Sequence, residues 1–151
     1  MLYENELNVR HRNQVLWALQ RHAPRTQVYR QDGLRPIDGW LGFGRQMARG
    51  VEIKRRTNRY GMTLSPICGE GYMIDVRKIE DGLKLAAQRR AKLTLAVDLV
   101  DGLWAVSIEV IPAEWRIAPG GRYDRGDPYD LDRCFYIPPS VFKRLGASVT
   151  R

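Results

Sequence analysis

Hydrophobic and polar positions along the chain follow two periods, and each period predicts one kind of element. Apolar side chains three or four residues apart predict helices over residues 4–22, where Val15, Leu16 and Leu19 share one face, and over residues 75–91. Runs of alternating or continuous β-forming residues predict strands over residues 26–31, 35–41, 50–57, 92–100, 103–110 and 134–137. This order of elements predicts an α/β fold with a mixed sheet.

Turn-forming residues separate several of these elements. Asp101-Gly102 stands between two segments rich in β-forming residues, which is a strong signal for a hairpin. Asp75 stands where it can cap the second helix, and a glycine-rich, basic connection over residues 58–71 precedes that helix. We therefore expect a helix, three strands, a second helix, a β-hairpin and a tail.

The C-terminal part of the chain has a less regular pattern. Residues 118–132 combine proline, glycine and charges of both signs, which predicts a long surface loop. A pair of prolines after the last strand predicts a short helix that ends at Gly146. The length suits one domain, and we expect a single domain with a core over residues 4–110 and an irregular extension over residues 111–151.

The balance of charges favours a polyanionic partner. The 151 residues include 25 Lys plus Arg and 17 Asp plus Glu, which gives a net charge of +8. The pI is near 9.9, a value typical of proteins that bind nucleic acid, although a merely basic surface would give the same value. Most of the positive charge comes from arginine, whose planar guanidinium suits phosphate.

The same composition excludes several classes of protein. Two cysteines, Cys68 and Cys134, are too few for a disulfide scaffold or a cysteine-rich zinc site. Two histidines leave carboxylates as the material for any metal site. The sequence has no apolar run long enough for a membrane helix and no signal-peptide pattern, so we expect a cytoplasmic protein without a membrane partner.

Candidate chemistry is concentrated between Asp38 and Lys54. On a strand, Glu52 and Lys54 point to the same side, about 6.6 Å apart, and two neighbouring strands can bring Asp38 beside Glu52. Two adjacent carboxylates repel each other, and a divalent cation such as Mg²⁺ relieves that repulsion. The carbonyl oxygen of Ile53 can add a third ligand, and Lys54 then lies next to the metal-bound water. A Glu-x-Lys triplet alone is also compatible with an ordinary solvated strand face.

This arrangement resembles the PD-(D/E)XK nuclease superfamily. Pro36-Ile37-Asp38 corresponds to the PD element, with one extra residue between the proline and the acid, and Glu52-Ile53-Lys54 corresponds to the (D/E)XK element. The resemblance implies a restriction-endonuclease-like core, in which helices flank a central mixed sheet. It also implies a metal cluster at Asp38, Glu52 and Ile53, Lys54 as a catalytic residue, and hydrolysis of phosphodiester bonds.

Many members of that superfamily carry a further acid on the first helix. Glu4 lies near the apolar stripe of that helix and Glu6 lies away from it, so Glu4 is the favoured candidate. Both acids are equally consistent with a simple role in balancing the helix dipole.

Basic residues surround the triplet and are candidates for contacts with phosphate. They are Arg45, Arg49, Arg55, Arg56, Arg59 and Lys78. For Lys78, a solvated helix face is the simpler interpretation. We also expect His11 and His22 to be surface residues, and Asp98 and Glu109 to be charges at a sheet edge.

These observations favour a Mg²⁺-dependent endonuclease of a bacterium or phage, with Mn²⁺ able to replace Mg²⁺, acting on DNA; RNA stays open. Because the chain is short, we expect recognition of DNA shape, as in a homodimeric Holliday-junction resolvase that acts in recombination or repair. A small restriction, homing or repair endonuclease is an alternative. A non-catalytic nucleic-acid-binding module and a basic interaction or inhibitor protein are two others.

Overall fold

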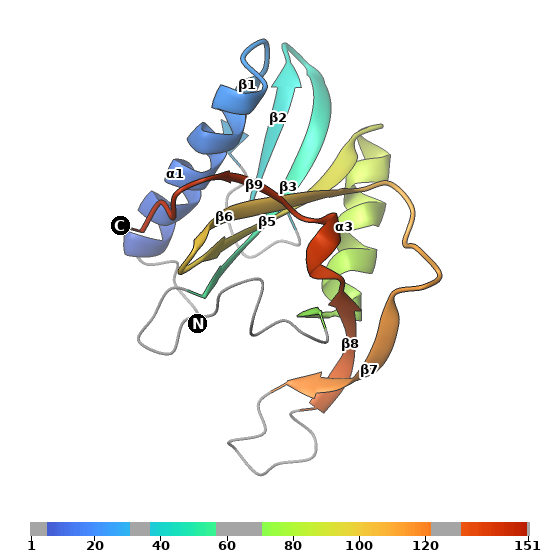
Figure 1. The fold of residues 1–151 in the computed structure, drawn as a ribbon. Coiled ribbons are helices and arrows are strands. Elements are labelled where there is room, and N and C mark those ends of the chain that lie inside the picture. The colour runs from blue at the N-terminus through green and yellow to red at the C-terminus, as the bar shows by residue number, and fades with distance from the viewer. Residues whose placement is uncertain (1–5, 31–36, 57–70, 122–130, 151) are drawn as a thin grey trace.

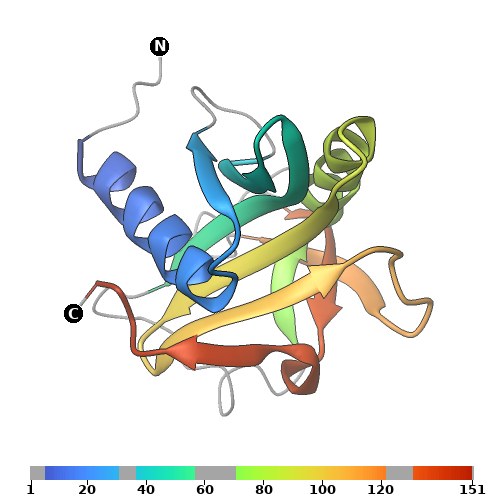
Figure 2. The same ribbon diagram turned by 90° about the horizontal axis from the view of Figure 1, so that it is seen from above.

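The computed structural model places two helices on opposite faces of a large twisted sheet (Figures 1 and 2). The helices are α1 (Glu6–His22) and α3 (Val76–Gln88). This mixed α/β architecture agrees with the PD-(D/E)XK fold that the sequence predicts. The structure describes residues 6–30, 37–56, 71–121 and 131–150.

The large sheet has six strands in the order β1-β2-β3-β5-β6-β9. Only the β3–β5 pair is parallel among these strands, and β4 (Tyr72–Asp75) and α3 lie between its two members in the sequence. The bounds of the strands are β1 (Gln27–Arg30), β2 (Gly39–Phe43), β3 (Gln46–Arg56), β5 (Lys92–Leu99), β6 (Gly102–Ile108) and β9 (Lys143–Gly146).

The predicted helices and the predicted hairpin are confirmed. The side chain of Asp75 accepts a hydrogen bond of 2.8 Å from the backbone N–H of Arg77, so it caps α3. β5 and β6 form the antiparallel hairpin around Asp101-Gly102. Several strand boundaries differ from the prediction; for example, β2 begins at Gly39 and β3 extends back to Gln46.

Side chains of the central strands point alternately to the two faces of the sheet, and each face has its own hydrophobic core. On one face, Val51 of β3 and Ala96 of β5 pack against the apolar stripe of α1. On the other face, Leu95 and Val97 of β5 pack with Ile79 of α3. Because α1 covers one face of the sheet and α3 the other, the middle of β3 is buried, and a charge placed there must have a specific partner.

A second, three-stranded antiparallel sheet corrects the prediction of a long loop. Its order is β4-β8-β7, and its strands are β4 (Tyr72–Asp75), β8 (Leu131–Ile137) and β7 (Arg116–Gly121). The two ends of the expected loop at 118–132 are therefore paired strands. Proline and glycine in β7 hid the alternating pattern that is typical of a strand. The hydroxyl of Tyr136 donates a hydrogen bond to the carbonyl oxygen of Pro119.

The expected short helix before Gly146 is also wrong. Only one 3-10 turn, η3 (Pro139–Val141), follows the prolines, and the chain then continues as β9. β9 pairs with β6 and forms an edge of the large sheet. The C-terminal part of the chain therefore supplies a strand to the same sheet that carries the candidate catalytic residues.

Two polar residues expected at the surface lie inside the molecule. Asp98 of β5 is fully buried, and its Oδ2 is 2.9 Å from Nε2 of His11 on α1. The hydroxyl of Thr150 and the backbone N–H of Val149 also donate to the Asp98 carboxylate. This cluster fastens the end of the chain to the sheet and to α1.

Neither described helix is long and apolar enough to cross a membrane.

Candidate active site

Asp38 is held against the central strand by two hydrogen bonds. Its backbone N–H donates to the carbonyl of Val51 at 2.7 Å, which extends the β2–β3 pairing by one step. Its carboxylate oxygen Oδ2 accepts a hydrogen bond of 2.7 Å from the backbone N–H of Ile53. The Asp38 carboxylate thus contacts the backbone of the Glu52-Ile53-Lys54 triplet itself.

Glu52 and Lys54 extend from the same face of β3, opposite the face that packs on α1. The ammonium Nζ of Lys54 is 3.0 Å from Oε1 of Glu52. The Glu52 side chain is only 3% exposed, whereas the Lys54 side chain is 26% exposed. The carboxylate is therefore a buried group with a cation at its open side.

Burial changes the acidity of both carboxyl groups. Burial raises the pKa of Glu52 to about 7; Lys54 opposes this rise and the Asp38 charge adds to it. Burial also raises the pKa of Asp38, against the N–H of Ile53 and the positive charges of Lys54 and Arg12. The two carboxyl groups are close enough to share a hydrogen bond. Such a pair binds protons or a cation more readily than an isolated carboxylate does.

Arg12 is a residue at this site that the sequence interpretation missed. It lies on α1, is buried, and its charge acts on the Asp38 carboxyl group. Arg12 belongs to the same helical stripe as Val15, Leu16 and Leu19. The position of an arginine within an apolar stripe could have indicated this role from the sequence, because a buried guanidinium needs a polar or anionic neighbour.

The donor groups present suit a small divalent cation. Mg²⁺ prefers oxygen ligands and is commonly held by one or two carboxylates. Asp38 and Glu52 supply two adjacent carboxylates. Ile53, which stands between Glu52 and Lys54 in the sequence, offers its carbonyl oxygen as a further ligand. No cluster of three His, Cys, Asp or Glu side chains occurs among the described residues. The candidate fourth group, Glu4, lies outside the described residues, and Glu6 is exposed in the first turn of α1.

Two of the basic residues proposed to contact phosphate lie beside the pair. Arg56 follows Lys54 on the same face of β3, and Lys78 of α3 acts on the charge of Glu52. Lys54, Arg56 and Lys78 line one cavity of about 190 Å³, whose wall also includes Asp75 and Asp132.

Other basic candidates point elsewhere. Arg49 lies on the α1 face of β3, where its Nη1 donates to the hydroxyls of Thr94 at 3.3 Å and Ser107 at 2.9 Å. Arg45 is exposed in the turn between β2 and β3, and Arg55 is exposed on the face opposite Lys54. Arg59 and Pro36 lie outside the described residues.

The mixed α/β fold, with an aspartate bonded to a Glu-x-Lys strand, defines a nuclease-like protein of the PD-(D/E)XK superfamily. The family model described as "Phage putative PDDEXK endonuclease" matches residues 43–145, more than half of the chain, and the chain belongs to this family. The match includes Glu52 and Lys54 and begins after Asp38. A comparison with curated proteins gave no match.

Proposed function

We propose that this protein is a metal-dependent endonuclease that hydrolyses phosphodiester bonds in DNA, with Mg²⁺ as the cofactor and Mn²⁺ as a substitute. The observation that carries the proposal is the hydrogen bond from the N–H of Ile53 to the Asp38 carboxylate. It brings the acid that precedes β2 to the Glu-x-Lys triplet of β3. Membership in an endonuclease family agrees with this chemistry.

Asp38 and Glu52, together with the carbonyl oxygen of Ile53, are the groups that would hold the cation. A bound Mg²⁺ supplies a Lewis acid for the phosphate and makes a bound water more acidic. The protein places both carboxylates in a buried setting, where a bound cation would compensate the cost of burying their negative charges.

Lys54 is the proposed catalytic residue for the attacking water. Its ammonium lies at the rim of the carboxylate pair and keeps partial access to solvent. From that position it can hold a water or balance negative charge that grows on the phosphate. A cation paired with Glu52 in this way also reduces the electrostatic cost of the buried carboxylates.

Lys78 and Arg56 are proposed to hold the phosphate backbone next to the scissile bond. Both residues line the cavity that Lys54 also lines, and both side chains are exposed. Phosphate contacts position a nucleic acid without reading its sequence, so they serve DNA and RNA alike.

Branched DNA is the proposed substrate within this class, because the basic residues beside the site, Arg56 and Lys78, offer contacts to phosphate, which position a nucleic acid without reading its sequence. A two-fold homodimer would place two sites for symmetric cuts, as recombination or repair of a Holliday junction requires. A small restriction, homing or repair endonuclease would cut linear duplexes instead.

To test this proposal, the protein is incubated with a supercoiled plasmid, a synthetic four-way junction or a matched single-stranded RNA, each with Mg²⁺, Mn²⁺ or EDTA. Metal-dependent cleavage that disappears in Glu52→Gln supports the nuclease, and preference for the junction supports structure selectivity. The matched control is Glu80→Gln on α3, which removes the same charge away from the pair. Binding without cleavage on all substrates would instead favour a non-catalytic binding module.

A further inference from the structure

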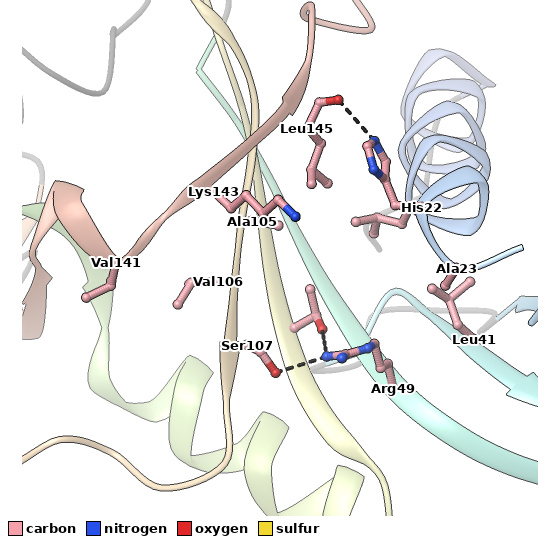
Figure 3. A pocket seen from close by; sticks show the side chains of 12 residues that line it. His22, Ala23, Leu41, Arg49, Ala105, Val106, Ser107, Val141, Lys143 and Leu145 are labelled. Carbon is pink, nitrogen blue, oxygen red and sulfur yellow. Dashed lines mark hydrogen bonds between the residues drawn. The ribbon is translucent and has the colours of Figure 1, made fainter.

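A second concave site lies on the α1 face of the sheet, away from the carboxylate pair. It is a pocket of about 310 Å³ between the end of α1, the strands β3 and β6, and the region of β9 (Figure 3). Its volume falls at the lower end of the range of small-molecule sites. The apolar part of its wall comes from Leu19, Leu41, Val106 and Leu145.

Arg49 and Lys143 carry positive charge into the lining of this pocket, and none of the described residues that line it is acidic. Figure 3 shows Arg49 of β3 and Lys143 of β9 extending into the pocket, with His22 on the α1 side. The Arg49 guanidinium is oriented by the hydroxyls of Thr94 and Ser107. The charge of Arg49 also acts on Glu109, which lies outside the lining and pairs with Lys92 at 2.7 Å.

His22 is held at the wall of the pocket by a hydrogen bond. Its ring donates from Nε2 to the carbonyl oxygen of Leu145 at 3.0 Å, so the imidazole bridges α1 and β9. Figure 3 shows this contact at the α1 side of the pocket, with the side chains of Arg49 and Lys143 extending from the sheet. Two basic side chains beside an apolar wall match a ligand with two negative charges on an apolar body.

We propose that this pocket binds a phosphate monoester carried on a flat apolar body, such as the 5′-phosphate of a nucleotide. Arg49 and Lys143 bind the phosphate dianion, because a carboxylate would neutralise only one of the two charges. The nucleoside packs on the wall formed by Leu19, Leu41 and Leu145. The same chemistry is found in a free mononucleotide and at the 5′-phosphorylated end of a DNA strand.

This site is separate from the carboxylate pair. Arg12, which acts on Asp38, and His22, which lines the pocket, are ten positions apart on α1, or about 15 Å along the helix axis. The two sites also lie on opposite faces of β3. Binding in the pocket therefore does not depend on catalysis or on a divalent metal, and its test is independent of the nuclease proposal.

The test measures binding of thymidine 5′-monophosphate to the full-length protein by isothermal titration calorimetry in EDTA, with thymidine as the unphosphorylated comparison. Arg49→Gln and Lys143→Gln should each weaken binding by about tenfold or more. Lys84→Gln, which removes an exposed charge from α3, should leave the affinity unchanged. Lys143 is exposed, so its substitution tests the site even where Arg49→Gln disturbs the sheet.

Two oligonucleotides distinguish the sources of the phosphate. Thymidylate tetramers with a 5′-phosphate or a 5′-hydroxyl are titrated in the same way. Selective binding of the phosphorylated tetramer supports a strand end, whereas binding of the mononucleotide alone supports a free nucleotide. Absence of binding by both phosphorylated probes, or affinities that Lys143→Gln and Arg49→Gln leave unchanged, would overturn the proposal.

Discussion

The carboxylate of Asp38 accepts a hydrogen bond of 2.7 Å from the backbone N–H of Ile53, the middle residue of the Glu-x-Lys triplet. The position of this acid is therefore set by the backbone of β3 and not by side-chain packing. Because the bond uses one lone pair of Oδ2, the carboxylate keeps other lone pairs for a cation. The predictions for the two acids and the lysine follow from this relationship.

Asp38→Asn should remove metal-dependent stabilisation while preserving the fold. The asparagine side-chain oxygen can still accept the bond from Ile53, but it contributes no negative charge. For the unchanged protein, Mg²⁺ at 100 times its Kd should stabilise the native state by about 2.7 kcal/mol and raise the Tm by several degrees. Thermal unfolding with and without Mg²⁺ should show this increase for the parent and none for the variant.

The control for this experiment is Asp81→Asn, which removes an exposed carboxylate from α3. Its Tm should respond to Mg²⁺ like that of the parent protein. An equal Mg²⁺ response in Asp38→Asn would show that Asp38 is not a ligand.

Lys54→Gln should lower the cleavage rate by about 100-fold or more, the usual range for a residue that assists proton transfer. Binding of DNA should change little, because Arg56 and Lys78 still line the adjacent cavity. Single-turnover cleavage and binding in Ca²⁺ separate these two effects. Parallel loss of binding and cleavage would indicate a general charge or folding effect, and Arg55→Gln, a charge removed from the opposite face of β3, measures the size of that effect.

Glu52→Gln should make the protein more stable than its parent at high pH in EDTA. The pKa of Glu52 rises from 4.5 to about 7 on folding, so the folded state binds more protons between these values. The contribution of Glu52 to the stability of the parent is thus largest below pH 4.5, falls as the pH rises to about 7, and then levels off. The loss amounts to about 3 kcal/mol, since one pKa unit corresponds to about 1.4 kcal/mol.

Urea unfolding at pH 5 and pH 8.5 measures this effect. The difference between variant and parent should grow from near zero at the lower pH to a clear gain for the variant at the higher pH. Addition of Mg²⁺ at pH 8.5 should reverse the order, because only the parent keeps the Glu52 carboxylate. A constant difference across this pH range would contradict the raised pKa.

The pairing of Asp38 with Glu52 could be predicted from the sequence because it depends on local rules. Side chains alternate between the two faces of a strand, and a short connection makes β2 and β3 antiparallel neighbours. The register of this pair then decides whether the two acids lie side by side. The hairpin around Asp101-Gly102 and the cap at Asp75 depend equally on local residues. The roles of Asp38, Glu52 and Lys54 remain predictions.

The features that the sequence did not reveal depend on contacts between distant segments. The hydrogen-bond partners of Asp98 come from α1 and from the C-terminal residues. The sequence of β5 alone shows only that a charged residue occupies this position. Arg12 is buried for a similar reason, because Asp38 approaches it from another element. β9 was missed because it joins the sheet at its edge beside β6, where few apolar residues are needed.

Asp98→Asn should destabilise the protein by about 2–4 kcal/mol at pH 7, since it leaves a buried cluster with mismatched donors. Burial alone would raise the pKa of Asp98, but hydrogen bonds from His11, Thr150 and Ser148 outweigh it and lower the pKa below 3.8. The stabilisation is therefore complete above pH 3.8 and is lost as the pH falls through the lower pKa of the folded state.

Urea unfolding of Asp98→Asn and its parent at pH 7 and pH 2.5 tests this relationship, and the difference in stability should shrink at the acidic pH. Glu109→Gln is the matched control, because it breaks an exposed ion pair with Lys92 on the same hairpin and should change stability little. Amide exchange of Val149 reports the local consequence, since its N–H donates to Asp98. Faster exchange there in Asp98→Asn, with no change in β2 or β3, would show that this carboxylate secures the chain end independently of the carboxylate pair. Unchanged stability of Asp98→Asn at pH 7 would contradict the prediction that this carboxylate stabilises the protein.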